Sequence, residues 1–468
     1  MDEELSAVRE AIDDIWQVAR GFGLDPFPIH FEIVPAAMMY EFGAYGLPGR
    51  FSHWTHGKAY HQMKTAYDYG LSKIYELVIN TDPCYAFLME GNSLLQNKLV
   101  IAHVIAHCDF FKNNVYFQQT NRHMVESASA SAERVRKYEF LHGALEVEKF
   151  LDAVLSIQEH IDSNIHVGRR PAVAHKADAR KRAMKETPYD DLFYIGSCER
   201  PQEAPKAKKV PEEPEEDLLL FIMEHAVGLE DWQLDIIDIV RSEALYFLPQ
   251  IKTKIMNEGW ASYWHSRILR EINLTEEESV EFARLHSSVL APSRRNINPY
   301  YVGMKMLEDV EKRWEEPNED EKQRFDRQGG EGRQKIFDVR STESDVSFLR
   351  NYLTKQLVED LDLYIYKREG GQWRIVEKDW EKVRDALVNA AANMGRPRIV
   401  VEDGDYCGNR ELYLKHIYEG QELDIGYAEK TLREVYALWG RTVHLETVVD
   451  GKCAKFWYNG LKNDKMLV

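Results

Sequence analysis

The chain has 468 residues, of which 44% are hydrophobic and 11% aromatic, so it is long enough for two to four domains with sizeable cores. This composition excludes an intrinsically disordered protein. With 60 lysines and arginines against 78 aspartates and glutamates, the net charge is −18, which argues against nucleic acid as a partner because nucleic-acid-binding proteins present basic surfaces.

The cysteines and the N-terminus indicate a cytoplasmic protein. The 5 cysteines form no Cys-x-x-Cys pair, which is typical of reduced intracellular thiols and not of a disulfide framework. The first residues, MDEE, are acidic and lack the basic and apolar regions of a signal peptide. The most apolar stretch, residues 99–111, is interrupted by two histidines and an aspartate, and no run reaches the roughly 18 residues of a membrane span.

Residues 1–162 are expected to form an N-terminal helical block, followed at 163–216 by a charged, poorly ordered linker. Apolar residues recur at helical spacing in the expected helices, at residues 5–21, 60–79, 96–113 and 124–161. Glycines and a proline mark residues 43–58 as a loop. The linker is first basic, then acidic and proline-bearing, a composition that predicts poor order.

Residues 217–375 are expected to form a second helical block that completes the same body. Its predicted helices lie at residues 218–226, 231–247, 250–272, 277–285, 302–314 and 345–362. Pro249 is expected to begin the helix at 250, because proline suits the first turn of a helix. Residues 315–332 are charged and contain glycines, which predicts a further linker.

Residues 376–468 have a different pattern, helix–strand–strand repeated twice, which predicts a small α+β domain with an internal duplication. The helices are expected at 380–394 and 427–438, and the strands at 398–402, 411–416, 442–449 and 452–458. Asp450-Gly451 is a strong hairpin signal between the last two strands. The predicted fold class is therefore mainly α, a large helical body with a small C-terminal α+β domain.

The segment QNKLVIAHVIAHCDFFKNN, residues 96–114, carries a His-x-x-x-His pair. His103 and His107 are four residues apart, so on a helix both rings project from one face and can reach one divalent metal ion. The spacing resembles the His-Glu-x-x-His helix of zinc peptidases, but Val104 occupies the place of the general-base glutamate. The alternative is a pair of core histidines bonded to carboxylates or carbonyl groups.

The segment KIMNEGWASYWHSRIL, residues 254–269, supplies a carboxylate. Its Asn-Glu-Gly sequence resembles the segment of the gluzincin aminopeptidases whose glutamate is the third zinc ligand, which points to Glu258. Gly259 is costly within a helix and indicates that another group approaches its backbone closely. We expect His103, His107 and Glu258 to bind zinc, or another divalent metal, where the two helical blocks meet. The alternative is two separate buried polar clusters.

Further residues are candidates for the same site. His265 lies on the helical face of Glu258 and is a candidate fourth ligand or proton donor, and Asp109 follows the histidine pair as a second catalytic candidate. The loop at 43–58 suits a lid or substrate-binding loop. The residues predicted to bind substrate are Arg50, Trp54, Asn257, Tyr263 and His286. No cofactor-binding residues are predicted, because the chain has no P-loop and no G-x-G-x-x-G fingerprint.

Four long segments, HVIAHCDFFKNN, YFLPQIKTKIMNEGWASYWHSRIL, NPYYVG and SDVSFLRNYLTKQLVEDLDLYIY, resemble the stage V sporulation protein R (SpoVR) family, in the right order and across nearly the whole chain. The resemblance implies a role in forming the spore cortex, a modified peptidoglycan. Relatives occur in bacteria that make no spores, often encoded beside a PrkA-type kinase and a von Willebrand-like protein, which suggests such partners.

Two functions follow from these observations. The first is a zinc-dependent amidase or peptidase acting on a peptidoglycan-derived substrate, with a gluzincin-like site. The alternative is a non-catalytic regulatory or assembly protein that binds a kinase or an envelope-assembly partner.

Overall fold

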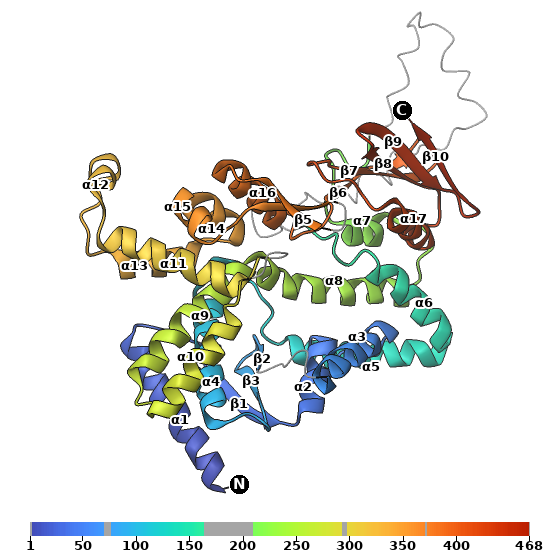
Figure 1. Cartoon of the computed structure of the whole chain (residues 1–468). Coiled ribbons are helices and arrows are strands. Elements are labelled where there is room, and N and C mark those ends of the chain that lie inside the picture. The colour runs from blue at the N-terminus through green and yellow to red at the C-terminus, as the bar shows by residue number, and fades with distance from the viewer. Residues whose placement is uncertain (1, 70–75, 163–208, 293–296, 370–371, 468) are drawn as a thin grey trace, which may run out of the picture. The chain divides into compact units, whose positions relative to one another are not determined.

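The computed structural model describes residues 2–69, 76–162, 209–292, 297–369 and 372–467 (Figure 1). The chain divides into two compact units, each built from two segments. Unit 1 comprises Met1–Lys149 and Ser242–Arg396, and unit 2 comprises Phe150–Arg241 and Pro397–Val468. Helices predominate and a five-stranded sheet lies in unit 2, which confirms the predicted fold class.

Unit 1 contains most of the helices. They are α1 (Asp2–Gly21), α2 (Ala36–Tyr45), α3 (Trp54–Asp68), α4 (Leu94–Asn113), the 3-10 turn η1 (Val115–Phe117), α5 (Met124–His142), α9 (Lys254–Glu271), α10 (Glu276–Val289), α11 (Pro299–Glu315), α12 (Glu319–Phe325), α13 (Gly332–Thr342), α14 (Asp345–Tyr352), α15 (Lys355–Asp360) and α16 (Trp380–Ala392). Two of the three boundaries between the units fall within α6 (Ala144–Leu155) and α8 (Asp231–Lys252), and the third follows Arg396.

Helix α4 lies at the centre of the core of unit 1. It begins with a capping box, in which Ser93 and Gln96 satisfy each other's backbone N–H groups. It packs against α1 and α9, and α9 packs in turn against α11 (Figure 1). Residues 100–111 of α4 are all buried, so its polar side chains have to find partners inside the protein.

A three-stranded sheet interrupts the helices of the first block, where the sequence predicted none. Strand β1 (Ile29–Val34) pairs in parallel with β3 (Cys84–Met89), and β2 (Glu76–Ile79) pairs with the other edge of β3 in antiparallel fashion. The expected helix at 60–79 is therefore wrong at its end, where residues 76–79 form β2. Short apolar runs do not distinguish a buried strand from a helix, which explains the error. The hairpin of β4 (Ile365–Glu369) and β5 (Gln372–Glu377) was not predicted either.

Several helix boundaries also differ from the prediction. Pro249 lies inside α8, and the break before α9 comes at Thr253, whose hydroxyl donates to the carbonyl of Pro249. The predicted helix at 124–161 ends at Gly143, which has a φ of 94° that favours glycine, and α6 follows. The predicted linker at 315–332 contains α12, which Asn318 caps. Thr354 caps α15 and divides the predicted helix at 345–362.

Unit 2 is an α+β arrangement. Its sheet has the order β10-β9-β8-β7-β6, and only the central pair β7–β8 is parallel. The strands are β6 (Ile399–Tyr406), β7 (Glu411–His416), β8 (Val443–Val449), β9 (Lys452–Tyr458) and β10 (Asn463–Leu467). Helix α17 (Ile425–Trp439) packs on β8 and β9, and α7 (Leu218–His225) packs on β6.

The C-terminal strands and helices were predicted correctly, apart from β10, which was missed. Helix α16, which was expected to pair with β6 and β7, packs instead against α14 and α15 of unit 1. The predicted linker at 163–216 lies mostly outside the described residues. At its described end, Glu215 forms a β-bridge with Val401 of unit 2.

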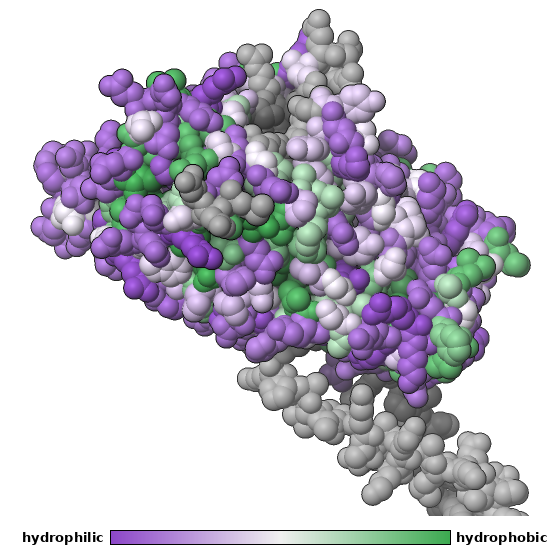
Figure 2. Space-filling model, turned by 90° about the horizontal axis from the view of Figure 1, so that it is seen from below, coloured by the Kyte–Doolittle hydropathy of each residue, from purple (hydrophilic) through white to green (hydrophobic). Residues whose placement is uncertain are grey.

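The face of the molecule seen in Figure 2 is mainly hydrophilic, and hydrophobic residues form small patches on it. This surface agrees with the strongly acidic composition. Among the described residues, no helix is long and apolar enough to cross a membrane.

Candidate metal centre

His103 and His107 project from the same face of α4, as their spacing predicted. Their ring centroids are 4.6 Å apart and the rings are nearly perpendicular. Both side chains are buried, with exposed fractions of 2% and 4%. Two imidazoles buried side by side need polar partners, because an unpaired buried polar group costs free energy.

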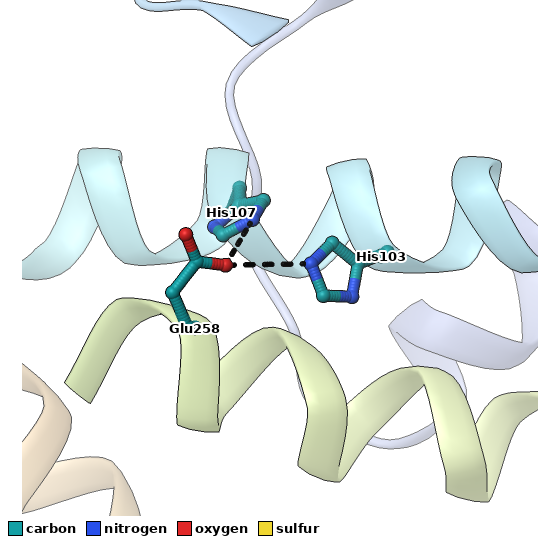
Figure 3. A group of neighbouring side chains, drawn as sticks. All are labelled: His103, His107 and Glu258. Carbon is teal, nitrogen blue, oxygen red and sulfur yellow. Dashed lines mark ion pairs between the residues drawn. The ribbon is translucent and has the colours of Figure 1, made fainter. Parts of the chain in front are cut away.

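Glu258 of α9 faces the two histidines. Its Oε2 atom lies 3.7 Å from Nε2 of His103 and 3.5 Å from Nε2 of His107. One ligand atom from each of the three residues lies within 4.8 Å of the others. Figure 3 shows the same carboxylate oxygen directed at both rings from the facing helix. The expected proximity of the three side chains across α4 and α9 is thus confirmed.

These distances match the spacing of ligands around one metal ion. Two atoms bound to zinc at about 2.0–2.1 Å in tetrahedral geometry lie about 3.4 Å apart. A direct hydrogen bond would bring nitrogen and oxygen to about 2.7–3.2 Å. Among the described residues, the buried Oε2 of Glu258 accepts no hydrogen bond at that distance. The carboxylate oxygen therefore lies at the distance from both rings that ligands of one shared cation have.

The charges around Glu258 favour its ionised form. Burial alone raises the pKa of a carboxyl group, but the neighbouring His103 and His107 outweigh this effect and hold the pKa of Glu258 well below its usual range. Glu258 therefore carries a negative charge at neutral pH. An anionic oxygen and two imidazole nitrogens are a suitable donor set for a divalent cation.

Asn257 fixes the orientation of His107. The Nδ1 atom of His107 donates a hydrogen bond of 2.9 Å to Oδ1 of Asn257. In the neutral form that binds metal, His107 has its one N–H on Nδ1, so its Nε2 lone pair can bind a cation on the side of Glu258. The structure places Asn257 behind a candidate ligand, and its predicted role in binding substrate stays a prediction.

His265 lies behind His103 and is completely buried. Its Nδ1 is 2.8 Å from Nδ1 of His103, and its Nε2 is 2.9 Å from Nδ1 of His286 on α10. Both ring nitrogens are in hydrogen bonds with other histidines, so neither is available as a fourth metal ligand. Burial, together with the neighbouring histidines, holds the pKa of His265 well below its ordinary value, and His265 is neutral.

Asp109 connects three parts of unit 1 through its carboxylate. Its Oδ2 accepts hydrogen bonds from Nε1 of Trp260, at 2.9 Å, and from Nη1 of Arg340, at 2.8 Å. Its Oδ1 accepts from the backbone N–H of Asp25. With these donors around it, Asp109 is a buried partner of Arg340, and its catalytic role stays a prediction.

A cap at its start and a close contact with α11 hold α9 in place. The sequence did not predict the cap. Asp345 accepts hydrogen bonds from the backbone N–H groups of Ile255 and Met256, and thus caps the first turn of the helix that carries Glu258. A Cβ atom on Gly259 would lie 2.4 Å from the backbone of Gly303, so α9 and α11 touch at a pair of glycines. The close approach expected at Gly259 is confirmed. No local pattern marked Asp345 as a cap, because its partners are about ninety residues away.

The remaining predicted substrate-binding residues have other contacts. Arg50 forms an ion pair of 2.7 Å with the buried Glu243 of α8 and donates to the carbonyl of Tyr45. Trp54 is 52% exposed at the start of α3. Tyr263 is buried, with the guanidinium of Arg267 3.5 Å from its ring centre. A role for these residues in binding substrate stays a prediction.

Fold and site together define a mainly α protein with a candidate metal centre between two core helices. The chain belongs to the SpoVR family: the family model "SpoVR like protein" matches residues 2–396, and "SpoVR-like C-terminal domain" matches residues 397–450. It is 29% identical to the uncharacterized protein YcgB of Escherichia coli (strain K12) over 464 residues, which covers 92% of this chain and 90% of that protein. No solved structure matches the chain.

Proposed function

We propose that this SpoVR-family protein is a metal-dependent hydrolase in which His103, His107 and Glu258 bind Zn²⁺ or another divalent cation. The observation that carries the proposal is the convergence of three ligand atoms, within 4.8 Å, from two helices of one core. Two histidines and one carboxylate form the protein ligand set of catalytic zinc sites, which keep one position open for water or substrate.

The residues of the chain prepare this site before any ion binds. Helices α4 and α9 hold the donor atoms at a fixed separation, and Asn257 turns the lone pair of His107 toward Glu258. A bound Zn²⁺ would polarise a carbonyl group and lower the pKa of its water ligand. Val104, completely buried, is not the glutamate that serves as general base in zinc peptidases, so the proton acceptor comes from another position.

For the substrate, we propose an amide bond in a peptidoglycan-derived fragment, processed in the cytoplasm. The support for this substrate is the family, whose name refers to sporulation, together with the resemblance to the glutamate-bearing segment of gluzincin aminopeptidases. Hydrolysis of precursors or recycled fragments is a cytoplasmic step that suits a protein without a membrane-spanning helix among its described residues.

Metal analysis of the purified protein tests the site directly. After washing with a chelator, wild-type protein should rebind about one equivalent of zinc, iron or manganese, and Glu258→Gln should weaken binding strongly because it removes the anionic donor but keeps the side-chain volume. His61→Ala is the matched control, because His61 is an exposed histidine of α3. A wild-type protein that rebinds none of these metals would overturn the proposal and leave the regulatory alternative.

Activity is tested with muropeptide amides as substrates. We expect a chelator to abolish hydrolysis and added metal to restore it. Glu258→Gln should show no hydrolysis at any metal concentration at which the wild type is active. Stoichiometric metal binding without hydrolysis of any amide would retain the metal site and contradict the hydrolase.

A further inference from the structure

The first turn of α9 is capped from another part of the chain. Thr253, the residue directly before α9, does not cap the helix with its side chain, and its hydroxyl donates to the carbonyl of Pro249. The cap is Asp345, whose Oδ2 accepts a hydrogen bond of 2.9 Å from the N–H of Ile255 and whose Oδ1 accepts one of 3.0 Å from the N–H of Met256. Both oxygens of one carboxylate therefore hold the start of α9.

Asp345 also lies at the start of α14, because it is the first residue of that helix. The N-terminal end of a helix carries a partial positive charge, so the starts of two helices stabilise one carboxylate here. Asp345 is buried, with an exposed fraction of 5%. A buried carboxylate is costly unless it is paired or hydrogen-bonded, and the two N–H groups of α9 meet that need. The contact joins two helices of unit 1 that are far apart in the chain.

The capped turn is the one that carries Glu258. Ile255, Met256 and Glu258 lie within four consecutive residues, about one helical turn. The Oε2 atom of Glu258 lies 3.7 Å and 3.5 Å from the facing nitrogens of His103 and His107. Metal–ligand distances are satisfied only within about 0.2 Å, so a small rotation of this turn would move the carboxylate out of reach of a shared ion. A group that orients the turn therefore determines the position of Glu258.

The same turn is in contact with α11. A Cβ atom on Gly303 would lie 2.1 Å from the carbonyl oxygen of Ile255, so the backbones of α9 and α11 approach each other closely there. This contact limits how near the two helices come. The two hydrogen bonds to Asp345 orient the turn, because hydrogen bonds are directional.

We propose that Asp345 is a positioning residue of the candidate metal centre, which orients the first turn of α9 and thereby holds the carboxylate of Glu258 opposite His103 and His107. This inference rests on the metal site proposed above. Residues that hold metal ligands in place typically change metal affinity about 10- to 100-fold when they are replaced. A residue with a purely structural role would instead lower stability and leave the metal affinity of the folded protein unchanged.

Zinc affinity and thermal unfolding are measured together in full-length variants, at pH 8 because burial raises the pKa of Asp345 to about 7. Asp345→Ala removes both acceptor oxygens and should weaken zinc binding about 10- to 100-fold at temperatures where circular dichroism shows the variant to be folded. Asp345→Asn keeps one acceptor oxygen and should lose less affinity.

The matched control is Asp379→Ala. Asp379 caps the first turn of α16, also in unit 1, by accepting hydrogen bonds from the N–H groups of Glu381 and Lys382. Its replacement should lower the unfolding temperature and leave zinc affinity unchanged. Equal losses of affinity in Asp345→Ala and Asp379→Ala would overturn the proposal, because any weakened helix start would then have the same effect.

The visible absorption of bound Co²⁺ gives a second measurement, which Asp345→Asn provides even if Asp345→Ala does not fold. The absorption reports the geometry of the ligands, so the spectrum should change in Asp345→Asn and not in Asp379→Ala. Wild-type affinity and spectrum in the variants of Asp345 would overturn the positioning role and retain the metal site. Wild-type protein that binds neither Zn²⁺ nor Co²⁺ would overturn the metal site and this inference together.

Discussion

Asp109 shows how one buried charge can hold several elements together. Its carboxylate accepts hydrogen bonds from Trp260 on α9 and Arg340 on α13, and it is itself on α4. Removing one member of a buried ion pair leaves the other charge uncompensated, which typically costs about 3–5 kcal/mol. We therefore expect Asp109→Asn to lower the free energy of unfolding by about 3 kcal/mol or more.

Chemical denaturation followed by circular dichroism measures this effect. The control is Asp68→Asn, which removes an exposed ion pair with Lys64 and should change stability little. Asp109→Asn protein that is as stable as wild type but inactive would contradict the structural role and support the catalytic one predicted from sequence.

His56 gives the fold a dependence on pH. Burial, together with the nearby charge of Arg50, lowers the pKa of His56 to about 4, whereas the unfolded chain has a pKa of about 6.5. As the pH falls, His56 therefore binds a proton at a higher pH in the unfolded chain than in the folded protein. The stability that neutral His56 contributes is complete above pH 6.5 and is lost progressively between pH 6.5 and about 4.

Denaturation of the metal-free protein at pH 7 and pH 5 tests this. Because the ring keeps some contact with solvent, the effect is smaller than for a fully buried group. We expect the free energy of unfolding to fall by roughly 1 kcal/mol more in wild type than in His56→Gln between pH 7 and pH 5. Metal-free protein is used so that the loss of a bound metal ion at low pH does not add to the result. Identical losses in the two proteins would contradict the lowered pKa.

At the scale of single residues, the sequence predicted the members of the site but not what supports them. The spacing of His103 and His107 and the Asn-Glu-Gly segment are local patterns, so they could be recognised in the sequence. The contacts of Asp109 with Arg340, and of Asp345 with the start of α9, join residues far apart in the chain. No periodicity or motif indicates such pairs before the chain is folded.

At the scale of elements, the crossing of α9 and α11 fixes the position of Glu258. The two helices touch at Gly259 and Gly303, and a Cβ atom on Gly303 would lie 2.1 Å from the carbonyl oxygen of Ile255. Inserting a methyl group at such a contact typically costs about 1–3 kcal/mol. We expect Gly259→Ala to destabilise the protein by at least this amount and to weaken metal binding, because α9 has to move.

Gly57→Ala is the matched control for this substitution. Gly57 also lies within a helix, α3, but no atom is within 4 Å of the position of its Cβ. Its replacement should leave stability unchanged or raise it by about 0.5–1 kcal/mol, because alanine favours a helix. A similar change in the thermal unfolding temperature for both substitutions would show that helix propensity, and not the contact between α9 and α11, determines the effect of replacing Gly259.

Long periodic elements were predictable from the sequence, and short buried ones were not. Helices α4, α11 and α17 have apolar residues at helical spacing and capping residues at their starts, which are the signals that predict a helix from sequence. Strands β1, β2 and β3 are at most six residues long and pair with one another across the sequence. Their conformation is determined by those pairings, which the sequence does not show locally.

At the scale of the whole molecule, two independent divisions of the chain agree at one place. The two family models meet between residues 396 and 397, and the boundary between unit 1 and unit 2 falls between Arg396 and Pro397. Unit 2 also includes Phe150–Arg241, and Arg398 there pairs with Glu216. The C-terminal module of this protein is therefore completed by a segment from the middle of the chain, which composition alone did not indicate.

The candidate metal centre is divided between the two segments of unit 1, and this leads to a last prediction. His103 and His107 precede residues 163–208, and Glu258 follows them. Cleavage at a protease site inserted into residues 163–208 should leave the two fragments associated, because α4 and α9 pack against each other across the cut. The nicked protein should elute from a size-exclusion column as one species and bind zinc like the uncut protein. After separation in denaturant, neither fragment should bind zinc with that affinity, since neither has all three ligands. Fragments that separate in native buffer would contradict the packing of α4 on α9, and an N-terminal fragment that binds zinc alone at full affinity would contradict the role of Glu258.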